Sequence, residues 1–146
     1  MSLSNAAEAA LLDLLFLNTD FANIGDATGL RGSTAAGSYY VALYTADPGE
    51  AGTPTTNEAT YTGYARKAVA RSGAGFSRSV STISNVAAVQ FDTCTAGSNT
   101  ITHWGLVTSS SGLGTLLISG ALGSSINVSA NIAPYFAIGA LTATAD

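Results

Sequence analysis

Charged side chains are scarce in this sequence. Asp, Glu, Lys and Arg make up 10% of the 146 residues, against roughly 25% in an average soluble domain. Residues of the apolar set reach 47%, whereas intrinsic disorder requires low hydrophobicity together with high charge. The sequence therefore predicts one folded domain over residues 1–146, a length typical of single domains.

Cysteine and histidine occur once each. A lone Cys94 cannot form an internal disulfide, and Cys94 with His103 supplies too few ligands for a zinc site. The sequence thus predicts no metal and no cofactor. The fold must be stabilised by burying apolar surface, either within the chain or against a partner.

Basic residues and long apolar runs are also few. Five Lys and Arg stand against nine Asp and Glu, a formal net charge of −4, and this excludes the basic surface that nucleic-acid binding needs. The longest apolar stretch, Ala9–Leu17, contains Asp13 and is too short to span a membrane. The first residues lack the positive start of a secretory signal, so export by that route is not expected.

Formal charges are unevenly distributed along the chain. From Ser79 to the end, Asp92 and Asp146 are the only ones, and polarity there rests on Ser, Thr and Asn. Because interface cores are depleted in charge, this half is interpreted either as a surface that a partner covers or as a Ser/Thr surface in water. Four of the five cations lie within thirteen residues: Arg66, Lys67, Arg71 and Arg78.

This basic cluster has two interpretations. In the first, the cations protect an edge strand against aggregation. In the second, they dock the protein electrostatically onto an acidic partner surface. The sequence alone leaves both open.

One helix is predicted near the start, over about residues 5–18, with Asn5 as its N-cap and Glu8 completing a capping box. The helix is more apolar than one buried side requires, so packing between subunits is expected. The residues assigned to that packing are Leu11, Leu14 and Leu15. A long glycine-rich loop follows, over about residues 22–38.

Short β-strands are predicted from Tyr39 onward, because Tyr, Val, Ile and Thr cluster between turn residues. About eight strands without intervening helices predict an all-β fold, a jelly-roll-like β-sandwich over about residues 39–142. The expected strands are Tyr39–Thr45, Tyr61–Ala70, Gly75–Val80, Ile83–Phe91, Thr100–Thr108, Thr115–Ser119, Ser125–Ala130 and Tyr135–Thr142.

Catalytic motifs are not found. His103 is the only histidine, and no Gly-x-Ser-x-Gly elbow accompanies it. Cys94 resembles a thiol nucleophile only if its strand pairs with that of His103, and a semi-buried thiol is the favoured interpretation. The acids Asp47, Glu50 and Glu58 fall in a Pro/Gly/Thr-rich segment and are interpreted as a solvated loop. We expect no catalytic residues and no enzyme.

Several segments resemble a family of small virion proteins of tailed bacteriophages, often labelled tail fibre proteins. The most specific is Tyr39–Gly52 (YYVALYTADPGEAG), and Gly63–Arg66, Ile83–Asn85 and Ile101–Gly105 are also similar. Within that family the chain is similar to a capsid cement protein of a Bordetella phage. The resemblance implies a jelly-roll protein that decorates the head.

The resemblance and the composition together lead to one expectation. The chain is a structural virion protein on the outer surface of the head, assembled in the host cytoplasm, that bridges capsid subunits as a capsid cement or decoration protein. Its expected partners are the major capsid protein and itself as a homo-oligomer, for which a dimer is favoured and a trimer stays open. The expected docking residues are Arg66, Lys67, Arg71 and Arg78, with Leu11, Leu14 and Leu15 between subunits.

Two alternatives belong to other classes. A tail-associated fibre or receptor-binding module would contact cell-surface glycans through Tyr61, Tyr64 and Trp104. A hydrolase would use His103 with Cys94 or Asp92.

Overall fold

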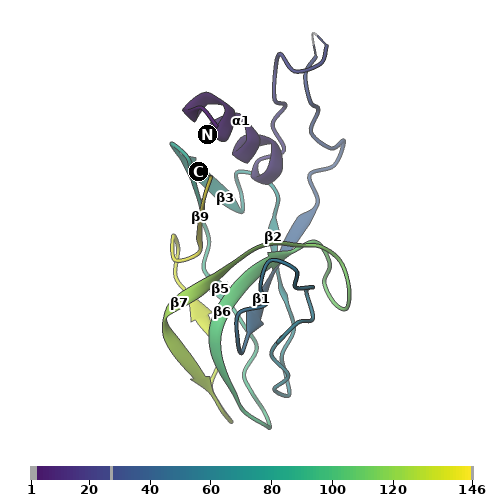
Figure 1. The fold of residues 1–146 in the computed structure, drawn as a ribbon. Helices are drawn as coiled ribbons and strands as arrows, with labels where there is room; N and C mark the ends of the chain where they lie inside the picture. The colour runs from purple at the N-terminus through teal and green to yellow at the C-terminus, as the bar shows by residue number, and fades with distance from the viewer. Residues whose placement is uncertain (1–2, 27, 146) are drawn as a thin grey trace. The chain divides into compact units, whose positions relative to one another are not determined.

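The computed structural model describes residues 3–26 and 28–145 (Figure 1). It is mostly β with a single N-terminal helix, which confirms the predicted all-β class, while the jelly-roll topology stays a prediction. The elements are α1 (Asn5–Phe16), β1 (Ser38–Tyr44), β2 (Lys67–Ala70), β3 (Phe76–Ser79), β4 (Thr82–Asn85), β5 (Val89–Gln90), β6 (Asn99–Val107), β7 (Leu116–Val128), β8 (Tyr135–Phe136) and β9 (Thr142–Thr144).

Internal contacts divide the chain into two compact units, which are described separately. The first unit comprises Met1–Ser38, Ala70–Ala88 and Phe136–Asp146, and the second comprises Tyr39–Val69 and Val89–Tyr135. That they form one domain stays a prediction.

Helix α1 of the first unit begins one residue earlier than expected. Ser4, not Asn5, is its N-cap, because the Ser4 Oγ accepts a hydrogen bond from the Ala7 N–H at 3.4 Å. The helix ends at Phe16, two residues before the predicted end, and Asn18 follows with a positive φ of 56°. Both neighbouring residues at the start are good N-caps, so composition alone could not choose between them.

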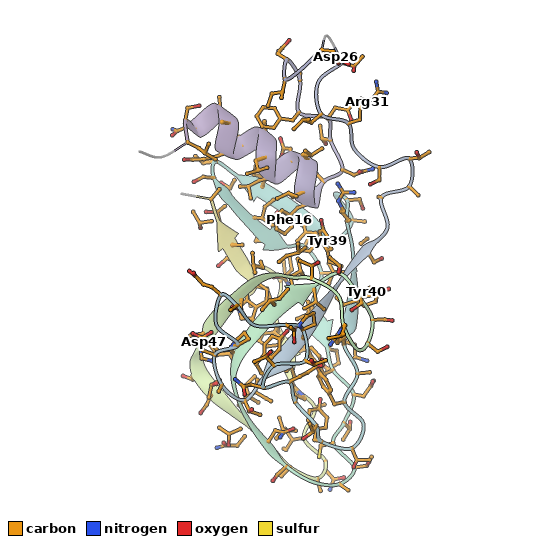
Figure 2. All side chains as sticks on the ribbon, turned by 45° about the vertical axis from the view of Figure 1, so that its right-hand side comes forward. Phe16, Asp26, Arg31, Tyr39, Tyr40 and Asp47 are labelled. Atoms are coloured by element: carbon orange, nitrogen blue, oxygen red, sulfur yellow. The ribbon has the colours of Figure 1, made fainter. Side chains whose placement is uncertain are left out.

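One side of α1 is buried against the first unit's sheet. Its buried residues are Glu8, Leu12 and Phe16, spaced four apart and therefore stacked on one face. The Phe16 ring meets the ring of Phe76 on β3 edge to face, with centroids 5.3 Å apart, a favoured aromatic geometry. Figure 1 shows α1 beside β3, and Figure 2 shows Phe16 on the side of the helix that faces the strand.

The sheet under α1 has the order β3-β4-β9, and both pairings are antiparallel. Asn85 at the end of β4 is buried and uses its whole side-chain amide. Its Nδ2 donates to the carbonyls of Ala87 and Ala137, and its Oδ1 accepts from the Leu141 N–H. One buried side chain thus fixes the segment before β9 to β4.

The predicted loop after α1 is held by hydrogen bonds between its two sides. Phe21 and Leu30 form a β-bridge, and the Asn18 side chain exchanges two hydrogen bonds with the backbone of Ser33. Figure 2 shows Asp26 near the tip of this loop, where its Oδ1 accepts hydrogen bonds from the hydroxyl and the backbone N–H of Thr28. This bonding lowers the pKa of Asp26.

The second unit is built on the sheet β2-β1-β6-β7. β1 pairs antiparallel with β6, from Tyr40 opposite Val107 to Tyr44 opposite His103. β6 then pairs antiparallel with β7. Gly105 of β6 is required by packing, because a Cβ there would lie 2.7 Å from the Tyr44 ring. A separate two-stranded sheet joins β5 and β8.

Several strand boundaries differ from the prediction. The strand expected at Tyr61–Ala70 begins only at Lys67, because the chain turns at Gly63, whose φ is +103°. Ile83–Phe91 is divided into β4 and β5, and Tyr135–Thr142 contributes only β8 before β9 begins. Conversely, the strands expected at Thr115–Ser119 and Ser125–Ala130 are one strand, β7.

Candidate functional site

The most elaborate polar cluster, within the second unit, surrounds Arg66. Its guanidinium binds Glu58 through two hydrogen bonds, Nε to Oε1 at 2.6 Å and Nη2 to Oε2 at 2.8 Å. Nη1 donates to the carbonyl and the hydroxyl of Ser109, and Nη2 also donates to the carbonyls of Pro54 and Gly112. We call Arg66 and Glu58 with these acceptors the arginine clamp.

The clamp joins three segments that are distant in sequence. The Arg66 side chain is 2% exposed and that of Glu58 is 15% exposed. Hydrogen bonding to Glu58 raises the pKa of the Arg66 guanidinium, while burial opposes that shift. The Tyr64 hydroxyl also donates to Glu58, at 2.9 Å, and burial is the main cause that raises the pKa of Tyr64.

The clamp bears on two interpretations. Arg66 has five N–H donors, and the acceptors just named can occupy all of them, while its role in docking a partner stays a prediction. Glu58 is not part of a solvated loop, because its carboxylate is largely buried and paired. Sequence reasoning missed the pair since neither residue type is ordinarily buried.

Two other predicted docking cations stabilise helix α1 in the first unit. Arg71 donates from Nε to the Leu15 carbonyl at 2.6 Å and from Nη2 to the Leu14 carbonyl at 2.5 Å. The last turn of α1 has no basic residue of its own, so Arg71 supplies the positive charge that a helix C-terminus favours. Arg78 forms a two-point ion pair with Asp13 of the helix.

Lys67 is the fourth predicted docking residue. Its Nζ lies 2.7 Å from Asp92 Oδ2, and this pair is far more exposed than the clamp. The fifth cation, Arg31, lies 3.6 Å from Asp20. Of the four predicted docking cations, Arg66 and Lys67 belong to the second unit and Arg71 and Arg78 to the first. Each of them already has a partner within its own unit.

The three leucines predicted to pack between subunits lie away from the buried side of α1. Leu15 is exposed, and Leu11 and Leu14 are half-buried. The helix thus keeps apolar surface outside its contact with the sheet. This position is compatible with subunit packing, which stays a prediction.

The residues of the two alternative functions are placed unfavourably for them. Tyr61 and Trp104 are buried, and Tyr64 is stacked on Phe91, so these aromatics do not offer an exposed platform for sugar. Cys94 is fully buried, and its single S–H lies within hydrogen-bond reach of the carbonyl oxygens of Ala96 and Gly97, with Sγ 3.3 and 3.5 Å from them, as expected of a structural thiol.

His103 lines a shallow acidic groove on the second unit. The groove consists of two hollows of about 300 and 310 Å³ between the turn at Asp47–Glu50 and strand β7, and both hollows include Glu50 and Ser119. His103 Nδ1 is 2.9 Å from the Thr102 hydroxyl. The sequence placed Asp47 and Glu50 in a solvated loop, and gave no signal that β7 would lie beside them.

The described residues contain neither a membrane-spanning helix nor a cluster of metal ligands. Within residues 3–26 and 28–145, no helix has the length and apolar character needed to cross a bilayer. The same part of the chain holds no group of three or more His, Cys, Asp or Glu side chains placed to bind a metal ion.

Comparison with known proteins gives the chain a family. A search of curated proteins finds no match. A family model described as podophage GP4 fiber I protein gp80 matches residues 2–144, which is nearly the whole chain. The chain therefore belongs to the podophage GP4 fiber I protein gp80 family, a family of structural phage virion proteins rather than of enzymes.

Proposed function

We propose that this virion protein is a decoration protein of the capsid, bound to the outer surface of the head and bridging neighbouring capsid subunits. A protein that binds only the assembled shell stabilises it by mass action, and many weak contacts add together over the particle. The function is carried by surface burial and needs no catalytic group.

The observation that carries the proposal is the surface of the second half of the chain. After Ser79 the only formal charges are Asp92 and Asp146, yet large apolar side chains are exposed there. Leu113 is 74% exposed and Ile138 is 67% exposed. Interface cores are depleted in charged residues, so covering by a partner would account for the shortage of charge together with these exposed apolar side chains.

The positions of the cations change how docking is proposed to occur. Since Arg66, Lys67, Arg71 and Arg78 already have partners inside the chain, they do not offer a free basic surface. Docking is proposed to rest on apolar and backbone contacts instead. The exposed and half-buried leucines of α1 remain the proposed contact between copies, which we expect to form a dimer.

A fibre protein is the second candidate, favoured by the description of the family. A fibre shaft is commonly built from repeated units, and this sequence has no evident repeat. The buried aromatics also count against a glycan-binding tip. Both points favour a decoration protein of the capsid over a fibre protein.

Labelling the protein on intact virions separates the two candidates. Antibody-bound gold should cover the whole head in electron micrographs if the protein decorates the capsid. Gold confined to the tail would reject the decoration function and support the fibre. Heads that lack the protein should also release their DNA at a lower temperature, and this should be reversed when the purified protein is added.

A further inference from the structure

Strand β7 forms one edge of the four-stranded sheet. Its first part, Leu116–Ala121, pairs with β6 between Val107 and His103. Among the described residues, β6 is the only segment whose backbone is paired with that of β7. In an antiparallel edge strand, every second residue points its N–H and C=O away from the sheet, so this part presents backbone groups to an incoming chain.

This edge carries few of the features that normally prevent strands from adding to a sheet. Natural edges are protected by charged residues, proline, bulges or short length. Leu116–Ala121 has neither charge nor proline. Its one irregularity is near its start, where Leu117 is an extra residue between the pairs Val107–Leu116 and Leu106–Ile118, and Ile118–Ala121 then pair regularly with β6. The longer bulge comes only afterwards, where Leu122–Ser125 lie opposite Thr102 alone. The opposite edge, β2, has four residues and begins with Lys67.

The acidic groove indicates what chemistry the added strand would have. It runs along Leu116–Ala121, with Asp47 and Glu50 on its other wall. Figure 2 shows Asp47 on the loop that forms this wall. Neither acid is in an ion pair among the described residues, whereas Asp13, Asp20, Glu58 and Asp92 are.

We propose that the edge Leu116–Ala121 binds an extended basic segment of another polypeptide, which adds to the sheet as a strand. Main-chain hydrogen bonds to β7 supply affinity, as in other cases of strand addition. Side chains of the added strand alternate between the two faces, so Lys or Arg at every second position reaches the carboxylates of Asp47 and Glu50. The inference rests on the proposed function for its partner, a virion protein.

The edge is tested with the full-length protein and two capped seven-residue peptides, one alternating Thr with Lys and one alternating Thr with Glu. The Lys peptide should bind and shift the backbone amide signals of Leu116–Ala121 in NMR spectra, and the Glu peptide should bind more weakly. The double variant Asp47→Asn, Glu50→Gln should lose roughly 2- to 30-fold in affinity for the Lys peptide, the effect of two exposed charges.

Ser119→Lys places a positive charge on this edge and should reduce binding similarly. Ser124→Lys, in the bulged part of the same strand, is the matched control and should bind as the wild type does. Equal binding of the two peptides, or unshifted β7 amides up to the solubility limit of the Lys peptide, overturns the inference. A dimer in solution that Ser119→Lys dissociates would assign the edge to a second copy instead.

Binding to heads distinguishes this inference from the proposed function. Wild-type protein that binds the Lys peptide through β7 but does not cosediment with stripped heads would reject the decoration function and leave the edge site intact. Wild-type and Ser119→Lys proteins that bind heads equally would support decoration and reject β7 as the docking surface.

Discussion

Glu58→Gln should be among the most destabilising conservative substitutions in the chain. It removes one negative charge and leaves the Arg66 guanidinium, 2% exposed, with an uncompensated positive charge. Breaking a buried ion pair by removing one partner costs about 3–5 kcal/mol. For a chain of this length, that corresponds to a fall of about 10–15 °C in melting temperature.

The assay is thermal unfolding followed by circular dichroism, with urea unfolding for the free energy. Lys67→Met is the control, because it breaks the much more exposed Lys67–Asp92 pair and should cost at most about 1 kcal/mol. Adding Arg66→Met to Glu58→Gln should cost less than the sum of the two single changes, since both remove the same interaction. Equal and small effects of Glu58→Gln and Lys67→Met would refute the arginine clamp.

Three further predictions concern separate parts of the chain. Arg71→Met should destabilise the protein by about 1–2 kcal/mol and speed amide hydrogen exchange in α1, whereas Arg31→Met should do neither, because the Arg31–Asp20 pair is exposed. Burial raises the pKa of Tyr44 and of Tyr61 to about 12, whereas an unfolded tyrosine ionises near pH 10. Stability should therefore begin to fall above about pH 10, by about 1.4 kcal/mol per pH unit for each tyrosine whose pKa is raised, which includes Tyr64; urea unfolding that is unchanged up to pH 11.5 would contradict this. Cys94 should react with thiol reagents only in denaturant, because the folded chain buries it completely, and rapid labelling of the native protein would be inconsistent with that burial.

Local features of the structure were largely predictable. The apolar run after a capping residue gave α1, and the first strand, Tyr39–Thr45, differs from β1 by one residue at each end. These elements follow from periodicity and turn residues over short stretches. β7 was predicted as two strands, Thr115–Ser119 and Ser125–Ala130, whereas the chain continues as one strand between them and pairs with β6 on both sides of a bulge.

The polar arrangement could not be predicted, because it depends on contacts between distant residues. Arg66 binds the carbonyls of Ser109 and Gly112, more than forty residues away. The four cations are close in sequence, which indicated a common surface. In the structure they bind different partners, two of them in each unit. Charge patterns show how many cations the chain has, whereas pairing and burial depend on the fold.

The central claim is that the protein decorates the head, and its copy number in purified virions tests this most directly. Quantitative mass spectrometry against labelled standards gives the ratio of this chain to the major capsid protein. The decoration function predicts a ratio approaching that of the capsid protein itself. A few copies per particle, as for a component of the tail, would contradict it.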